Sequence, residues 1–216
     1  MPLTLRRSAR ARRISLRVSA LDGRVTLTLP QQVPDREALA FAEEKADWIR
    51  GHLAKQPQAV AVGIGAVVPV EGRNRRVVAA PGRRIILSDS AVAVPQASPA
   101  RSLQRYLKEL ARERLAAASD LYAARLGTGY SRLTLRDTRS RWGSCTADGG
   151  LMYSWRLILA PPGVLHYVAA HEVAHLREMN HSPAFWSLVE QIHGGYAVPR
   201  RWLRTSGALL HRFSFG

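Results

Sequence analysis

The sequence predicts an α+β fold, in which an antiparallel, β-rich region over residues 1–97 precedes a region over residues 98–216 that packs helices on a small sheet. Three observations support this class. The first third alternates apolar and polar residues with a period of two, which is typical of half-buried strands. The second half places apolar residues at helical spacing between proline and glycine stops. Pro95 to Pro99 lies between the two patterns and is expected to form the linker.

The N-terminal region is expected to start with a hairpin. Residues 14–18 and 25–29 alternate apolar and polar side chains, and Asp22-Gly23 between them is a typical hairpin turn. A helix is expected from about Asp35 to Gln56-Pro57. Its apolar stripe would comprise Leu39, Ala42, Ala46, Ile49 and Leu53. Three or four short antiparallel strands are expected between residues 60 and 94.

The C-terminal region is expected to start with a long helix. Ser98-Pro99 suits an N-cap and a first helical position, and Gly127 ends the helical pattern after Leu126. The strands expected next cover residues 133–135, 140–145 and 151–155. The helices expected after them start at Pro161-Pro162 and near residues 183 and 199, the last two ending near 193 and 212.

Simple features of the sequence suggest where the protein works. No segment approaches the roughly 20 uncharged apolar residues that cross a bilayer. The basic N-terminus is not followed by the apolar core of a signal peptide. The single cysteine, Cys145, has no partner for an internal disulfide, which fits a reducing compartment. We therefore expect a cytoplasmic protein that does not bind a membrane.

The sequence is strongly basic, with 32 lysine and arginine residues, 16 acidic residues and a formal net charge of +16. A GC-rich coding sequence would favour arginine over lysine, but it does not explain the excess of basic over acidic residues. A surface of this charge attracts polyanions. Nucleic acid and nucleotides are therefore candidate partners.

One short motif carries most of the chemical information. His171-Glu172-Val173-Ala174-His175 matches the pattern H-E-x-x-H on a predicted helix. Histidines four residues apart lie on one helical face, so both can bind a single zinc ion. Zinc lowers the pKa of a water that it binds, and Glu172 is placed to accept the proton as that water attacks. The motif therefore predicts a metal-dependent hydrolase.

The alternative is a helix with two ordinary histidines and a surface glutamate. It conflicts with the position of Glu172, which lies on the apolar stripe of this helix. An unpaired carboxylate buried there would cost several kcal/mol, whereas a nearby cation would offset that cost. The best third ligand is His181, on the turn before the next helix, and Glu178 is either a rival ligand or a partner that orients an imidazole.

Residues 171–186 resemble the signature H-E-x-x-H-x5-H-x3-F-W of small zinc metallopeptidases of the WLM and SprT-like type. The sequence resembles more closely the YgjP-like family of predicted metal-dependent hydrolases. The further matches are Arg139 to Cys145, Trp155-Arg156-Leu157 with Pro161, Arg12 to Arg17, and Lys45 to Ile49. The resemblance spans nearly the whole chain, with Ser154 as one small departure, since the family often has asparagine there.

The resemblance implies a minimal gluzincin-like domain over residues 98–216. His171, His175 and His181 would bind one zinc ion, and Glu172 would be the general base. The segment from Arg139 to Cys145 would form a strand close to the site. For Arg139, Arg141 and Trp142, the sequence is equally compatible with substrate contacts and with a purely structural role. Phe185 and Trp186 would be core residues that pack against the motif helix.

Three functions remain open on the sequence. The first is a metallopeptidase, whose peptide substrate would pair with a strand edge near residues 151–155. The second is a nucleoside-triphosphate pyrophosphatase that uses the same metal site, with arginines on the phosphates, an activity associated with members of the YgjP-like group. The third is a non-enzymatic, basic nucleic-acid-binding protein with a structural metal. The single cysteine argues against the third, because structural zinc sites are usually rich in cysteine.

Overall fold

The computed structural model describes residues 3–19, 23–54 and 58–216. The chain divides into two compact units, Met1–Gln58 and Ala59–Gly216. Each unit has its own hydrophobic core.

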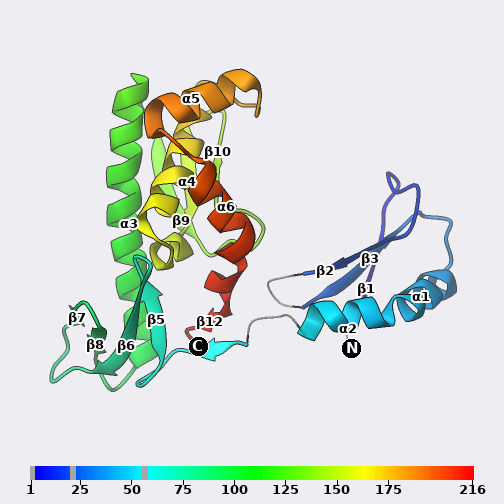
Figure 1. Cartoon of the computed structure of the whole chain (residues 1–216), viewed down its shortest axis with the longest axis horizontal. Helices are drawn as coiled ribbons and strands as arrows, with labels where there is room; N and C mark the ends of the chain where they lie inside the picture. Colours follow the sequence, from blue (N-terminus) through cyan, green and yellow to red (C-terminus); the bar gives the residue numbers. More distant parts are fainter. Residues whose placement is uncertain (1–2, 20–22, 55–57) are drawn as a thin grey trace. The chain divides into compact units, whose positions relative to one another are not determined.

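The first unit contains a three-stranded sheet and two helices (Figure 1). Its strands are β1 (Leu3–Arg7), β2 (Ser15–Val18) and β3 (Val25–Leu29), in the order β1-β3-β2. The predicted hairpin is confirmed, since β2 pairs antiparallel with β3. Its turn lies partly outside the described residues, which do not include Asp22. The sheet is not wholly antiparallel, because β1 lies parallel to β3.

The helix predicted after this hairpin forms as two helices, α1 (Asp35–Glu44) and α2 (Ala46–Ala54). The side chains buried on them are Ala38, Ala42 and Ile49. Leu39, predicted on the buried stripe, is 48% exposed. Ala42 and Ile49 are buried as predicted, whereas Ala38, four residues before Ala42, takes the buried position that was expected for Leu39. The end predicted at Gln56-Pro57 lies outside the described residues.

The second unit begins with short strands. These are β4 (Val60–Ala61), β5 (Val67–Val70), β6 (Arg73–Ala79), β7 (Ile86–Leu87) and β8 (Ala91–Val94). Four of them form a sheet in the order β5-β6-β8-β7, and β4 pairs with β12 (Phe213–Ser214). The antiparallel prediction holds for β5 with β6 and for β7 with β8. It is wrong for β6 with β8, which are parallel because β7 forms the hairpin with β8 and lies at the edge.

The division between the units differs from the boundary expected near residue 97. The buried valines of β5, β6 and β8 share one core with the long helix that follows, so this sheet belongs to the second unit. Those valines are Val68, Val70, Val77, Val92 and Val94. Burying these side chains against the helix removes apolar surface from water, which favours one shared core over two small ones.

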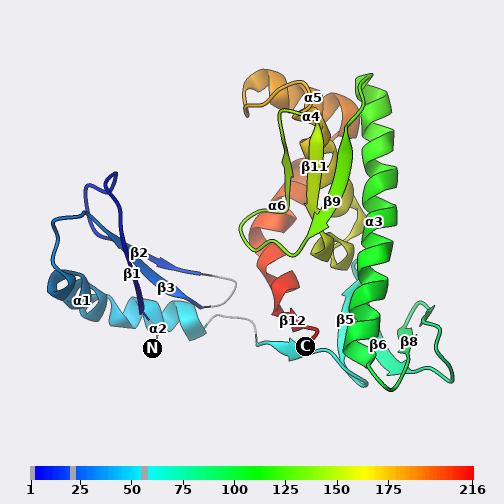
Figure 2. The same ribbon diagram turned by 180° about the vertical axis from the view of Figure 1, so that it is seen from behind.

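The long helix α3 (Pro99–Leu126) matches its prediction and has 28 residues. It ends at Gly127, whose φ of 66° lies in the left-handed region that glycine tolerates. A second sheet follows, made of β9 (Arg132–Arg136), β10 (Gly143–Cys145) and β11 (Gly150–Ser154) in the order β10-β11-β9. Figure 2 turns one face of this sheet to the reader, with α4 behind it and α3 at its side.

Helices complete the unit. A 3-10 helix η1 (Trp155–Leu159) leads into α4 (Pro162–Ala174), followed by α5 (Pro183–His193), α6 (Ala197–Ser206) and the 3-10 helix η2 (Gly207–Arg212). The sequence did not predict η1, and the helix expected over 199–212 is α6 followed by η2. The fold class is α+β, with helices packed on small sheets, as predicted. Among the described residues, no helix combines the length and apolar character that a membrane span requires.

The buried side chain of Arg156 forms hydrogen bonds with residues of several of these elements. Arg156 in η1 is 9% exposed and binds both carboxylate oxygens of Asp137 at 2.6 and 3.1 Å. It also donates to the backbone oxygens of Leu210 at 3.1 Å and Phe213 at 2.9 Å. A buried guanidinium needs such acceptors to offset its desolvation, so this network fixes η2 against the sheet.

Candidate metal centre

The helix α4 brings the motif to the centre of the second unit. Pro162 occupies the first turn of α4, where the backbone N–H that proline lacks would have no partner within the helix. Most side chains of α4 are buried. His171 and Glu172 lie in its last turn, and His175 follows as the C-cap residue. His181 lies in the loop before α5. The four-residue spacing and this loop bring the three histidines to one place.

Two hydrogen bonds that involve Ser182 hold the loop that carries His181. The backbone N–H of Ser182 donates to the side-chain oxygen of Asn180 at 2.9 Å. The Ser182 hydroxyl in turn accepts from the N–H of Phe185 at 3.3 Å and so caps α5, as its Ser-Pro start predicted. The position of His181 is therefore fixed by the start of α5.

The three histidines form a cluster with metal-ligand geometry. One potential ligand atom from each of His171, His175 and His181 lies within 4.8 Å of the others. The Nε2 atoms of His171 and His181 are 3.1 Å apart. Nδ1 of His175 lies 2.8 Å from the backbone oxygen of Glu178. If Nδ1 carries the proton and donates it there, the Nε2 lone pair is free for a metal. Glu178 therefore contacts the cluster through its backbone.

Aromatic rings pack around these imidazoles. Phe185 is fully buried, and its ring lies 4.4 Å from the ring of His175. The ring of Trp186 lies 5.8 Å from that of His181 and is stacked on it. These contacts restrict the rotation of both imidazoles, so α5 holds the ligands in position.

Burial keeps two of the imidazoles neutral. Burial, together with the neighbouring His175 and His181, lowers the pKa of His171 to about 3. Burial also lowers the pKa of His175, against the opposing effect of the Glu178 carbonyl. Only the neutral imidazole has a lone pair for a metal, so these shifts favour ligation.

Glu172 is the buried carboxyl group of the site. Its side chain is 5% exposed, and burial raises its pKa to about 8, although the charge of Arg141 opposes the shift. It packs directly against the backbone of β10. A Cβ atom on Gly143 would lie 2.5 Å from the Oε1 atom of Glu172, which is closer than nonbonded atoms approach. Glycine is therefore the residue that leaves room for this carboxyl group.

An open cavity of about 450 Å³ lies over the cluster. It is lined by the three histidines, Glu172, Ser140, Arg141, Gly143, Ser144, Cys145 and Met179. The family resemblance placed the segment from Arg139 to Cys145 close to the site, but the sequence assigned Gly143, Ser144 and Met179 no role of their own. Burial raises the pKa of the half-buried Cys145 thiol to about 11, so this thiol provides little of the thiolate that a nucleophile requires.

The structure separates the three substrate-binding candidates. Arg141 lines the cavity, whereas Arg139 and Trp142 do not. The Trp142 ring lies 5.2 Å from that of His211 and contacts Gly207. The predicted strand at 140–145 is formed only over 143–145, so strand alternation does not aim Arg139 and Arg141 at one face. Trp142 thus packs towards η2 and forms no wall of this cavity.

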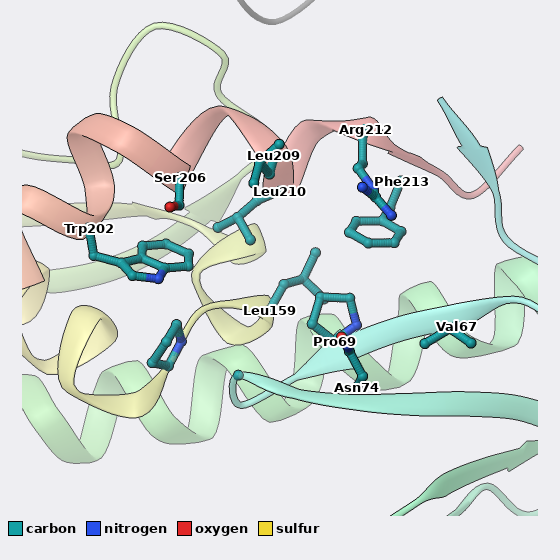
Figure 3. A pocket seen from close by; sticks show the side chains of 12 residues that line it. Val67, Pro69, Asn74, Leu159, Trp202, Ser206, Leu209, Leu210, Arg212 and Phe213 are labelled. Atoms are coloured by element: carbon teal, nitrogen blue, oxygen red, sulfur yellow. The ribbon is translucent and has the colours of Figure 1, made fainter. Parts of the chain in front are cut away.

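A second cavity has a different character. It holds about 350 Å³ between β5 and the α6–η2 segment and is lined mainly by apolar side chains (Figure 3). Trp202, Leu210 and Phe213 point into it in this view. None of the motif residues lines it, so the apolar cavity and the histidine cluster are separate features.

The donor set allows a test of which metal fits. Three imidazole ligands suit zinc and other late transition metals, whereas magnesium and calcium prefer carboxylate and carbonyl oxygens. In the described part of the chain, the buried Nδ1 of His171 has no hydrogen-bond partner, whereas its Nε2 faces the Nε2 of His181 at 3.1 Å, where a metal could lie between them. The cluster therefore fits a zinc-like ion.

A helix that carries two histidines and a glutamate, a third histidine on the next turn and a small sheet alongside define a metallopeptidase-type domain. The family model described as "YgjP-like, metallopeptidase domain" matches residues 12–206. The chain therefore belongs to the YgjP-like family, as its sequence resemblance predicted, and it is a hydrolase of the metallopeptidase class.

Two other comparisons add little detail. The chain is similar to a solved structure described as the metallopeptidase zymogen of Pyrococcus abyssi abylysin. The identity is 18%, the match covers 43% of this chain and 95% of that one, and the TM-score is 0.38. No curated protein matches the chain.

Proposed function

We propose that this protein is a zinc-dependent metallopeptidase with Glu172 as its general base. The observation that supports it best is the cluster of His171, His175 and His181 beside a buried carboxyl group at an open cavity. Catalytic zinc sites typically have three protein ligands and an open position, and this cluster offers three.

The chain's own residues divide the chemical work. A zinc ion bound by the three histidines would supply Lewis acidity to the water and to the scissile carbonyl. Glu172 accepts a proton from the attacking water at a carboxylate oxygen and later donates it to the amide nitrogen that leaves. The Glu178 carbonyl holds the ring of His175, and β10 fixes the Glu172 carboxyl group through the space left at Gly143.

The substrate is proposed to bind beside β10. The pairing expected near residues 151–155 is not available, because β11 already pairs with β10 on one side and β9 on the other. β10 is an edge strand of this sheet and lines the cavity over the histidines. An extended peptide that pairs with this edge would pass in front of the site.

Nucleoside-triphosphate pyrophosphatase activity is the second candidate. The observation that favours it is a group of arginines next to the site, including Arg141, which suits phosphate oxygens. The donor set weighs against it, because phosphate chemistry often uses magnesium on carboxylates. In the described part of the chain, the one metal-ligand cluster contains only histidines. A purely structural metal is less consistent with His181, which is exposed at an open cavity.

The decisive experiment measures metal and two activities on the same preparations. Metal content is measured by mass spectrometry, and hydrolysis is assayed on casein and on each nucleoside triphosphate. We expect about one zinc per chain. Glu172→Gln should keep the metal and lower casein hydrolysis by about 10²–10⁴-fold.

A matched histidine on the same helix provides the control. His171→Ala should lose the metal, whereas His166→Ala should keep it, because His166 contacts Tyr122 and lies outside the cluster. Native protein without metal, or metal that persists in His171→Ala, would contradict the proposal. Loss of triphosphate hydrolysis in place of casein hydrolysis would select the second candidate.

A further inference from the structure

A third cavity, of about 430 Å³, lies on the open face of the β10-β11-β9 sheet. Arg132, Arg136 and Arg141 line it, together with the hydroxyl groups of Thr134 and Ser144. No acidic side chain is among the residues that line it. This cavity, which we call the arginine pocket, lies on the face of the sheet that Figure 2 shows without a covering helix.

Strand alternation explains why these side chains share a face. Along β9, Arg132, Thr134 and Arg136 are exposed, whereas Leu133 and Leu135 pack against the core. The register places Thr134 beside Met152 of β11 and Met152 beside Ser144 of β10. The centre of the face therefore has small or flexible side chains, and the guanidinium groups stand at its borders.

The charge of the arginine pocket is only partly neutralised within the chain. Arg132 pairs with Asp148 at 2.7 Å, and both side chains are more than half exposed. In the described part of the chain, no carboxylate lies within ion-pair distance of Arg136 or Arg141. Two guanidinium groups thus remain able to bind an anionic group from a ligand.

The arginine pocket borders the cavity of the candidate metal centre at the edge strand β10. Ser140, Arg141 and Ser144 line both cavities. A chain that pairs with the edge of β10 therefore has its neighbouring side chains within reach of the arginine pocket. The guanidinium groups of the arginine pocket would therefore bind substrate side chains that lie next to the reacting bond.

We propose that the arginine pocket is a subsite for carboxylate groups, which selects polypeptide substrates with acidic residues next to the scissile bond. This inference rests on the proposed peptidase function. Guanidinium groups bind carboxylates through two parallel hydrogen bonds, and the hydroxyl groups add further donors. The lining includes no aromatic side chain, so the arginine pocket lacks the stacking surface with which proteins bind single-stranded nucleic acid.

The test measures binding, so it does not depend on turnover. Metal-loaded Glu172→Gln protein is titrated against a fluorescent peptide with two adjacent glutamates and against the same peptide with glutamines. At low salt we expect the glutamate peptide to bind about 10-fold more tightly. Arg136→Gln should reduce this ratio to below about threefold, and Arg136→Lys should give an intermediate ratio, because lysine keeps the charge but not the planar fork.

Two variants make the result specific. Arg136→Glu should reverse the preference, so that a peptide with two lysines binds more tightly than the glutamate peptide. Arg105→Gln removes another exposed arginine, on α3, and should leave the ratio unchanged. Equal binding of the glutamate and glutamine peptides, or an equal effect of Arg105→Gln and Arg136→Gln, would overturn the subsite.

Competition distinguishes the source of the anion. A nucleoside triphosphate or a single-stranded oligonucleotide that binds through Arg136 while the glutamate peptide does not bind would overturn the polypeptide assignment. The proposed function fails in a different way, namely if native protein cleaves no peptide. Charge-selective binding without any cleavage would therefore reject the peptidase, and cleavage without charge selection would reject only the subsite.

Discussion

The two faces of the β10-β11-β9 sheet carry different side chains. The inner face packs against α3 and α4 and includes Leu133, Leu135 and the backbone of Gly143, which touches Glu172. The outer face is open and carries arginines and hydroxyl groups. Burial on one side shifts pKa values, while exposure on the other keeps guanidinium groups free for ligands. The comparison suggests that reaction chemistry and substrate selection lie on opposite faces of a three-stranded sheet.

The largest effect is expected from the inner side, at the proposed third ligand. His181→Ala should lower zinc affinity by more than about 100-fold, because losing even an outer partner of a metal ligand costs about 10–100-fold. Competition with a chromogenic chelator measures this affinity. His52→Ala removes an exposed histidine from the first unit and should leave it unchanged. If His181→Ala keeps native affinity, His181 is not a ligand.

The next effect tests the contact between the strand and the carboxyl group. Gly143→Ala places a methyl group 2.5 Å from the Oε1 atom of Glu172, so the carboxyl group must move. We expect peptide hydrolysis to fall by about 100-fold, as misplacement by about 1 Å can cost this much. Metal content should stay native. Gly163→Ala in α4 meets no atom within 4 Å and serves as the control.

The raised pKa of Glu172 predicts how the stability of metal-free protein depends on pH. Its folded-state pKa, about 8, exceeds the ordinary value of 4.5, so the folded state binds more protons between these values. The stabilising contribution is complete below about pH 4.5 and is lost as pH rises towards 8. Chelator-treated native protein should therefore lose stability relative to Glu172→Gln as pH rises from 5 to 8. Parallel thermal unfolding curves at all pH values would contradict this assignment.

The smallest effect is expected on the outer face. Arg136→Gln should change the free energy of unfolding by no more than about 0.5 kcal/mol, since the side chain is exposed and has no acidic partner in the described part of the chain. Its metal content should also be native. Chemical denaturation and metal analysis together check this. A large loss of stability would show that the two faces are not independent.

Much of the site was predictable because it is local in sequence. His171, Glu172 and His175 share one helix, and His181 follows within one turn and one cap, so spacing alone brought them together. Gly143 was not predictable in the same way, because its contact with Glu172 depends on how β10 packs against α4. Trp142 is a residue type that often contacts substrates, which is why it was a candidate. Its ring packs towards His211, because β10 begins only at residue 143.

In the fold, too, the features that depend on contacts between distant segments were not predicted from the sequence. Alternation identified β2 and β3 but not β1, and the residues at its two ends identified α3. The sequence pattern of the valines in β5, β6 and β8 does not reveal whether they form a core of their own or share one with α3. The boundary was therefore expected near residue 97, whereas the two units divide after residue 58. The parallel pairing of β6 with β8 likewise depends on which strands meet, a long-range property that period-two alternation does not contain.

The close approach at Gly143 has a consequence for anyone who redesigns this enzyme by directed evolution. A library randomised at position 143 should be enriched in glycine among active clones, because the Cβ atom of any other residue requires the Glu172 side chain to shift. Ser144 next to it lines both the arginine pocket and the cavity over the histidines, so substitutions there should change substrate selectivity. Selectivity is therefore best diversified at position 144, with position 143 left untouched.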